Sequence, residues 1–498
     1  MVRSPDPAQG TRDSELKTRA LIKRCWESPS LTTWASLVAR SLNLVVVLPL
    51  VLKHFSTEEV VVWQLFATIL SMQLLLDLGL TPTFSRLIAY AMGGTTRFHS
   101  LRFVAPESVP EGSKPNWSAV AEIWTTMAWL YRRLLALAFF VLATFGTLAL
   151  LKPLSALGDR TSGWLAWSVV VITGPLIFST TLYGAYLQGV NEVAMLRRWE
   201  ALTACGAICS SVLVVLMGGR LLALTASIQI WTVVNVWRNR RLAEGVAGGI
   251  LKRFSKQGYS REMLRTAWPA AWRSGLGVFL TAGFVQLTGV FYAQVAAQAD
   301  AAAYLIAMRL ITAVSQFSQA PFYSKLPLLA RMHAQGRTLD MLGVARRGMR
   351  LALWTYVLGV SVVAFGMKPA LGLLGSSVMP VPSVLWWLLA AAFLAERFGA
   401  MHLQLYSLTN HIVWHIVTLV SGTISITTVL FSYSAIGVYA FPVSFIAGYC
   451  GFYSWYCARK VYATFGMQWL QFESSVGLTA AFGFCLSAGL QFWINHSA

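Results

Sequence analysis

Long apolar runs dominate the chain, and short polar or charged segments separate them. A helix needs about 20 predominantly apolar residues to cross the hydrocarbon core of a bilayer, and most of these runs approach or exceed that length. They fall at residues 31–52, 60–92, 127–151, 164–187, 200–217, 220–237, 275–298, 303–329, 350–374, 383–407, 411–431, 435–457 and 476–494. This pattern predicts an all-α polytopic membrane protein with about a dozen spanning helices.

The runs form two sets of six on either side of a charged segment, and one extra run follows them. We expect a basic tail (1–30), an N-terminal lobe (31–237), a linker (238–274), a C-terminal lobe (275–457) and an extension (458–498) that contains the extra helix. Because each lobe has six spans, both lobes enter the membrane from the same side, and a duplicated unit would form a parallel repeat. Pro82-Thr83-Phe84-Ser85-Arg86 and Pro321-Phe322-Tyr323-Ser324-Lys325 favour two related lobes, since a proline, an aromatic residue, a serine and a base recur in one register.

Composition agrees with a membrane protein, because 56% of the residues are hydrophobic and only 12% are charged. The formal net charge of +20 would by itself be compatible with nucleic-acid binding. Its distribution argues against that function: with a cytoplasmic N-terminus, the outside loops hold only Lys53, Lys152, Arg160, Arg220 and Lys368. Lys and Arg stay on the cytoplasmic side, where they face anionic lipid headgroups. We therefore expect a multi-pass protein with its N-terminus in the cytoplasm and no nucleic-acid partner.

Several motifs are absent from the sequence. The six cysteines include no C-x-x-C and no zinc spacing, and His402, His411 and His415 do not form a metal-binding motif. No phosphate-binding G-x-x-x-x-G-K-[ST] loop is found, and residues 1–30 lack the apolar region of a secretory signal. We expect no metal and no bound cofactor, although coupling to a proton or sodium ion stays open.

Five basic residues lie within or at the ends of predicted spans. Arg40, Arg309 and Arg397 are embedded, and an arginine at mid-bilayer costs roughly 2.5–3.5 kcal/mol, so it usually faces a cavity or a partner. Arg86 and Lys325 lie where their spans reach the cytoplasmic headgroups. We expect these five to contribute to a central cationic cavity that binds a diphosphate, whose oxygens match the guanidinium fork. Two simpler roles remain open: Arg86 and Lys325 as interfacial anchors, and Arg397 as a residue neutralised by a neighbouring helix.

Two carboxylates, Asp77 and Glu396, lie within predicted spans. Either one is a candidate for ion coupling or for pairing with a cavity arginine. Asp77 has a further structural alternative, because it precedes Gly79 and Pro82 and so could hydrogen-bond a helix that breaks there.

The first hairpin of the chain resembles that of a known family. Pro49-Leu50-Val51-Leu52 is followed by Glu58-Glu59 and Trp63, and then by Leu75-Leu76-Asp77-Leu78-Gly79-Leu80-Thr81-Pro82. These segments resemble the polysaccharide flippases of the multidrug/oligosaccharidyl-lipid/polysaccharide exporter superfamily, which have two six-helix lobes around a central cavity. The extra run at 476–494 and the insertion over residues 97–117 depart from that pattern.

The resemblance implies a function. It implies a non-enzymatic transporter of the bacterial inner membrane that moves an undecaprenyl-diphosphate-linked oligosaccharide to the outer leaflet by alternating access, in exopolysaccharide or O-antigen synthesis. Relatives carry cavity arginines on the first, second and eighth helices, which by position points to Arg40, Arg86 and Arg309. Expected partners are the lipid-linked oligosaccharide, membrane lipids, a polysaccharide polymerase and a chain-length regulator. The alternatives are a multidrug or cation exporter of the same superfamily and, in another class, a membrane-embedded polymerase or ligase.

Overall fold

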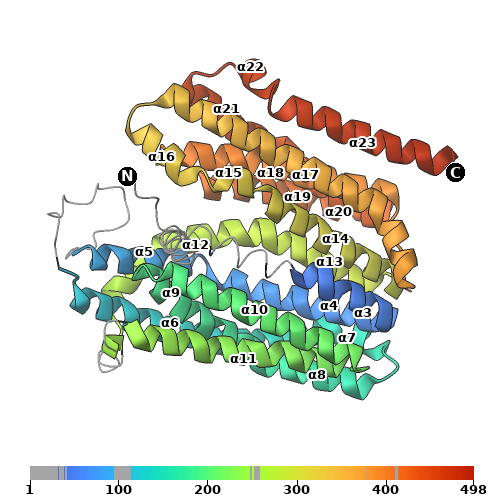
Figure 1. Cartoon of the computed structure of the whole chain (residues 1–498), viewed down its shortest axis with the longest axis horizontal. Coiled ribbons are helices and arrows are strands. Elements are labelled where there is room, and N and C mark those ends of the chain that lie inside the picture. The colour runs from blue at the N-terminus through green and yellow to red at the C-terminus, as the bar shows by residue number, and fades with distance from the viewer. Residues whose placement is uncertain are drawn as a thin grey trace, which may run out of the picture.

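The chain folds almost entirely into helices that run side by side along the long axis of the molecule (Figure 1). The computed structural model describes residues 42–94, 114–246, 249–251, 258–376, 378–409 and 413–497, with the isolated positions Thr32 and Ala39. No strand occurs among these residues, so the predicted all-α class is confirmed. Arg40, the basic tail, His411 and most of the insertion over 97–117 lie outside the described residues.

The N-terminal group of helices makes up the blue-to-green half of Figure 1. It consists of η1 (Asn43–Val47), α3 (Leu48–His54), α4 (Thr57–Met72), η2 (Gln73–Asp77), α5 (Leu80–Met92), α6 (Trp117–Val141), η3 (Leu142–Gly146), α7 (Thr147–Ser155), α8 (Arg160–Thr173), η4 (Gly174–Leu176), α9 (Ile177–Gly189), α10 (Val193–Leu216) and α11 (Leu221–Gly245).

The C-terminal group follows in yellow to red (Figure 1). It consists of α12 (Arg261–Val278), η6 (Phe279–Gly283), α13 (Phe284–Val295), α14 (Gln298–Ser318), α15 (Ala320–Tyr323), α16 (Leu326–Ala334), α17 (Thr338–Leu374), α18 (Ser383–Ser407), α19 (Trp414–Ile436), η7 (Gly437–Tyr439), α20 (Ala440–Gly448), η8 (Tyr449–Tyr453), α21 (Ser454–Phe465), α22 (Trp469–Glu473) and α23 (Gly477–Ser497).

Ten helical segments within the described residues are long and apolar enough to cross a membrane. One of them, Trp414–Phe465, contains two antiparallel helices, because Gly437 adopts a φ of 55° between α19 and α20, which pack against each other. Helix α11 is not among the ten, but it packs between α8, α9 and α10 of the N-terminal group. The chain is a multi-pass membrane protein.

Several helices extend beyond the apolar runs that predicted them. Helix α11 continues to Gly245 and α12 begins at Arg261, so much of the described part of the expected linker (238–274) is helical. Helix α17 begins at Thr338, twelve residues before its predicted run at 350–374. These extra turns carry charged residues, and a hydropathy pattern detects only the part of a helix that suits hydrocarbon.

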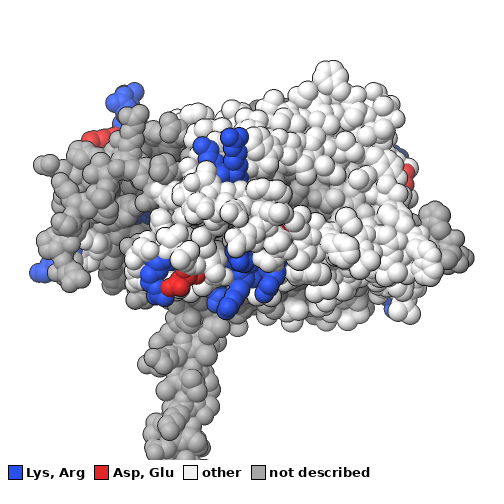
Figure 2. Space-filling model, turned by 90° about the horizontal axis from the view of Figure 1, so that it is seen from above, with Lys and Arg blue, Asp and Glu red and all other residues white. Residues whose placement is uncertain are grey.

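The two ends of the bundle differ in charge. At one end, here called the turn end, short turns follow α3, α7, α10, α13 and α19, whereas α6, α10, α12 and α17 begin at the opposite, basic end. The described Lys and Arg residues near the turn end are Lys53, Lys152, Arg160, Arg220 and Lys368. Figure 2 shows basic side chains gathered toward one half of the visible face, with few charged side chains over the rest.

Most of the apolar core that the two groups share lies toward the turn end. One buried cluster there joins α3, α4, α7 and α8 to α13, α14 and α17, with Val51, Leu65, Ala301 and Ile306 inside it. Toward the basic end, one cluster belongs to the N-terminal group together with Met263 of α12. The other large cluster lies within the C-terminal group. Apolar burial therefore joins the groups more completely at the turn end.

Local sequence signals position the helices at this seam. Ser56 and Glu59 form a capping box at the start of α4, in which the Glu59 amide donates to Ser56 Oγ (3.4 Å) and the Ser56 amide donates to Glu59 Oε2 (3.0 Å). Glu59 also pairs with Arg220 at 2.7 Å, which ties the start of α4 to the start of α11. Helix α4 in turn packs against α13 and α14 of the other group.

The extra helix α23 packs along α17 and α18. The Trp387 indole donates to Gln491 Oε1 (2.6 Å), and Gln491 Nε2 donates to the Ala364 carbonyl (2.7 Å). A half-buried amide whose oxygen and nitrogen both have partners holds this helix in one register. The extension is therefore part of the C-terminal group.

A close helix approach gives a test of the packing. A Cβ added to Gly399 of α18 would meet the ring of Tyr453 and lie 3.0 Å from the backbone Cα of Ser454. We expect Gly399→Ala to destabilise the protein by about 1–3 kcal/mol, because overpacking forces neighbouring groups to shift. Gly366→Ala is the matched control, since a Cβ at Gly366 of α17 meets open space. Thermal unfolding in detergent measures both, and equal melting temperatures for the two variants would contradict the close approach.

Candidate functional site

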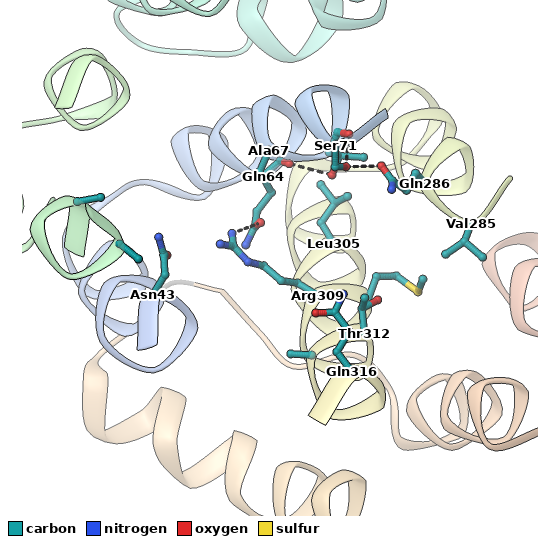
Figure 3. A pocket seen from close by; sticks show the side chains of 16 residues that line it. Asn43, Gln64, Ala67, Ser71, Val285, Gln286, Leu305, Arg309, Thr312 and Gln316 are labelled. Carbon is teal, nitrogen blue, oxygen red and sulfur yellow. Dashed lines mark hydrogen bonds between the residues drawn. The ribbon is translucent and has the colours of Figure 1, made fainter. Parts of the chain in front are cut away.

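A polar cavity of about 610 Å³ lies between the two groups of helices (Figure 3). Its walls come from η1, α4, α10, α13 and α14, so both groups contribute. Its polar lining residues are Asn43, Gln64, Thr68, Ser71, Gln286, Arg309, Thr312 and Gln316. Among the described lining residues, Arg309 is the sole charged side chain and no carboxylate occurs. The cavity is therefore built to present one positive charge amid amides and hydroxyls.

Arg309 makes its contacts across the seam between the groups. Its Nη1 donates to Gln64 Oε1 at 2.7 Å, and its Cζ lies 4.7 Å from the ring centroid of Trp63. Arg309 belongs to α14, whereas Trp63 and Gln64 belong to α4. A guanidinium within a membrane span needs such partners, because an unpaired charge in hydrocarbon is costly.

The cavity retains unused hydrogen-bonding capacity. Gln64 Nε2 and Asn43 Oδ1 are buried without a partner in the described structure. Figure 3 shows Arg309 and Gln64 directed toward each other, with Asn43 on the opposite wall and Thr312 and Gln316 beside them. Buried polar atoms are nearly always hydrogen-bonded, so unpaired ones beside a cation indicate room for a polar ligand or water. Gln64 Nε2 is a free donor beside Arg309 and suits an anion, whereas Asn43 Oδ1 is a free acceptor and suits a hydroxyl group.

A second polar contact closes the wall of the cavity. Ser71 Oγ of α4 donates to Gln286 Oε1 of α13, and both side chains line the cavity (Figure 3). Together with the Arg309–Gln64 bond, this contact links the N-terminal group to the C-terminal group. Both bonds must rearrange if the groups move apart along this seam.

Arg397 lies in the C-terminal group and is not among the lining residues of this cavity. Its Nη2 donates to Ser315 Oγ (2.6 Å) and lies 3.4 Å from Glu396 Oε2, and its Nη1 donates to Gln319 Oε1 (3.2 Å). The guanidinium is only 6% exposed. The neighbouring helix α14 and the adjacent Glu396 thus supply the partners that a buried charge requires.

Arg86 and Lys325 are both exposed and lie near the basic end, outside the lining of the cavity. Arg86 Nε donates to the Pro82 carbonyl at 3.3 Å within α5. Lys325 lies between α15 and α16. The structure therefore brings one of the four described cationic candidates, Arg309, into the cavity, and Arg40 lies outside the described residues.

Comparison with known proteins identifies solved structures that share the fold of this chain. No family model and no curated protein matches the chain. Among solved structures, an inward-facing multidrug resistance MATE family transporter of the MOP superfamily aligns with a TM-score of 0.65 at 10% identity, covering 87% of this chain and 98% of that chain. The lipid II flippase MurJ in an inward closed conformation aligns with a TM-score of 0.57 at 12% identity, covering 94% and 100%. An outward-facing MATE family transporter gives 0.54 at 10% identity, covering 91% and 98%.

The chain has the fold of the MOP-superfamily transporters. Residues far apart in the sequence build the cavity of this chain, because both helix groups contribute to its walls. The resemblance drawn from the first hairpin is confirmed at the level of the fold.

Asp77 lies at a break in the second span of this transporter fold. Leu78 and Gly79 adopt positive φ values of 48° and 71°, which end η2 before α5 begins at Leu80. Asp77 Oδ2 accepts from the Thr81 amide (3.1 Å), and Oδ1 accepts from Thr81 Oγ1 (2.8 Å) and from the Tyr131 hydroxyl (2.5 Å). The carboxylate therefore satisfies an amide that the break leaves free.

The neutral polar residues of the cavity were not predicted from the sequence, namely Asn43, Gln64, Thr68, Ser71, Gln286, Thr312 and Gln316. Charged residues stand out more clearly in an apolar run, because they are the most costly groups in a membrane. A signal was nevertheless present, since Gln64 and Gln286 interrupt otherwise apolar runs. Glutamine in a span usually hydrogen-bonds across helices, and both residues do so here.

The break at Asp77 yields a stability prediction. Asp77→Ala removes the acceptor for Thr81 and Tyr131, and we expect a loss of about 1–3 kcal/mol for the buried donors left unpaired. Asp77→Asn keeps one acceptor oxygen and should lose less. Apparent melting temperatures in detergent compare the variants. If Asp77→Ala is as stable as the wild type, the carboxylate does not hold the break, and a coupling role becomes the better explanation.

Proposed function

We propose that the protein is a flippase for an undecaprenyl-diphosphate-linked oligosaccharide, which it moves from the cytoplasmic to the outer leaflet of a bacterial inner membrane. The observation that supports this most is the lining of the central cavity, where Arg309 is the single charge and amides and hydroxyls surround it. Guanidinium donors match phosphate oxygens, and amide and hydroxyl groups match the hydroxyls of a sugar. No carboxylate among the described lining residues opposes an anion.

The physical task of such a transporter is to lower a solvation barrier. A diphosphate and its sugar hydroxyls cannot enter hydrocarbon alone, because each unpaired polar group costs several kcal/mol. The hydrogen-bonding groups around Arg309 replace part of the lost water. Gln64 and Trp63 also hold Arg309 in place when no ligand is bound, which limits the affinity and so helps release.

We infer that the basic end faces the cytoplasm and that the described conformation is open toward it. Lys and Arg residues gather at that end, as expected for cytoplasmic segments. The apolar core shared by the two groups lies toward the turn end, so separation is easier at the basic end. The better agreement with the inward-facing than with the outward-facing MATE structure supports the same inference.

Arg40 is a further candidate for the diphosphate site. It belongs to the first predicted span and precedes Asn43, a lining residue, by three positions in the sequence. Arg86, Lys325 and Arg397 are better explained by roles at the interface or within the C-terminal group. Coupling to a proton or sodium ion through Asp77 or Glu396 remains a prediction.

The first alternative is a multidrug exporter, because solved transporters with this fold include MATE multidrug transporters. A cationic drug would favour an acidic cavity, and Arg309 opposes it. A polymerase or ligase receives no support from the transporter fold. The lining of the cavity therefore favours the lipid-linked glycan.

Deletion of the gene followed by complementation tests this function. We expect undecaprenyl-diphosphate-linked oligosaccharide to accumulate in the cytoplasmic leaflet of the deletion strain, and the wild type to relieve this. Arg309→Ala should rescue poorly, with at least about a tenfold loss of rate, since a hydrogen bond to a charged group contributes about 1.5–3 kcal/mol. Arg160→Ala, which removes an exposed arginine from the turn end, should rescue fully.

Two outcomes would contradict the proposal. If repeat units reach the outer leaflet normally in the deletion strain, the protein is not their flippase. If Arg309→Ala rescues as well as Arg160→Ala at equal membrane abundance, the central arginine does not bind the diphosphate.

A further inference from the structure

A second basic site lies on the flank of the molecule, away from the central cavity. A cavity of about 490 Å³ lies between α6 and α12 near the basic end. Three arginines line it: Arg133 comes from α6, and Arg261 and Arg265 lie one turn apart on α12. None of the three has a carboxylate partner in the described structure, so three positive charges converge without compensation.

Aromatic residues frame this basic cavity. The Arg133 Cζ lies 4.0 Å from the ring centroid of Trp129. The Trp129 ring also stacks on the ring of Tyr259, and the two ring centroids are 4.4 Å apart. Trp268 completes the lining from α12. Trp and Tyr beside basic residues are typical of the level of the lipid headgroups. The setting is that of a membrane interface.

The helix contacts that form this cavity are fixed by hydrogen bonds. The Ser260 amide donates to Thr126 Oγ1 (2.9 Å), and Thr125 Oγ1 donates to the Gly258 carbonyl (3.2 Å). Ser260 also caps α12 by accepting from the Met263 amide at 3.2 Å. These bonds hold the start of α12 against α6, so the three arginines are positioned by the fold.

A separate apolar cavity of about 510 Å³, here called the slot, lies farther along the same two helices. One wall comes from α12, which contributes Trp272, Gly275 and Leu276. The other wall comes from α6, which contributes Ala138 and Val141. Arg265 and Leu276 are separated by about 16 Å along the helix axis, from a rise of 1.5 Å per residue. Trp268 of the basic cavity and Trp272 of the slot are one turn apart on α12, so the two cavities follow each other along this helix and the slot lies nearer the middle of the membrane.

Irregular helix segments shape the slot. The π-helical segments η3 and η6 and the 3-10 segment η2 all contribute lining residues, among them Leu142, Phe279 and Leu75. Leu78, with its positive φ, also lines the slot. Such irregularities are rare and frequently mark functional sites, and here three of them meet at one cavity.

We propose that the basic cavity and the apolar slot together bind one anionic phosphoglyceride of the bilayer, with its phosphate on Arg133, Arg261 and Arg265 and one hydrocarbon chain in the slot. The three arginines of the basic cavity match a lipid phosphate, and the apolar lining of the slot matches a hydrocarbon chain. Helix α6 belongs to the N-terminal group and α12 to the C-terminal group, so the lipid bridges them. Its binding stabilises the described arrangement, because a ligand shifts a conformational equilibrium toward the state it binds best. This inference does not depend on which substrate is transported.

Lipid titration of the purified full chain tests the proposal. Native mass spectrometry would follow the binding of phosphatidylglycerol and of phosphatidylcholine, and thermal unfolding would follow stabilisation by each. We expect preferential binding of and stabilisation by phosphatidylglycerol. The triple variant R133Q/R261Q/R265Q should weaken its binding by about a hundredfold. The matched control R347Q/R350Q/R459Q removes three exposed arginines from the same end and should bind as the wild type does.

A slot variant tests the chain site separately. Leu287 lines the slot and is 40% exposed, so Leu287→Trp fills the slot from its rim without disturbing the buried core. We expect it to weaken phosphatidylglycerol binding while the preference over phosphatidylcholine remains.

Three results would overturn the proposal. Unchanged phosphatidylglycerol binding by the triple variant or by Leu287→Trp would exclude the basic cavity or the slot, respectively. An equal loss in the control triple would mean that general charge attraction explains the binding. Stabilisation by undecaprenyl diphosphate but not by phosphatidylglycerol would assign the site to the transported lipid.

Discussion

A guanidinium placed inside the membrane between two helix groups is the constraint on which the central site depends. Arg309 cannot stay in hydrocarbon unpaired, and its partners Gln64 and Trp63 come from the other group. The same contacts that solvate the charge therefore hold the seam together. Ser71 and Gln286 add a second polar bond across it. In the proposed function, a ligand that binds Arg309 competes with its contacts to Gln64 and Trp63. Because these contacts cross the seam, ligand binding is coupled to movement of the two groups.

The distribution of apolar packing complements this polar seam. Toward the turn end one core passes through both groups, whereas the other two large cores each lie within one group, apart from Met263 of α12. Opening at the basic end consequently exposes less apolar surface than opening at the turn end. The proposed lipid between α6 and α12 would bridge the groups at the basic end, where they share the least core.

The sequence predicted the fold well but the site only in part. The all-α class followed from the length of the apolar runs, and hydrogen bonding at a helix break was one of three roles left open for Asp77. The predicted helix ends differ from the observed ones, because amphipathic turns such as those that begin at Arg261 are less hydrophobic than a membrane span. Arg309 was found since a buried charge is rare. Its partner Gln64 was missed, because a neutral amide reveals its role only through contacts between distant helices.

The most direct test of the central claim is the binding of undecaprenyl diphosphate to the purified protein in phosphatidylcholine nanodiscs, which leave the flanking basic cavity without an anionic phosphoglyceride. Wild type and Arg309→Ala would be compared by equilibrium titration. We expect at least about a tenfold weaker affinity for Arg309→Ala, because the charged hydrogen bonds to the diphosphate are lost. Equal affinities for the two proteins would contradict a diphosphate site at Arg309 and would indicate that the cavity binds another substrate.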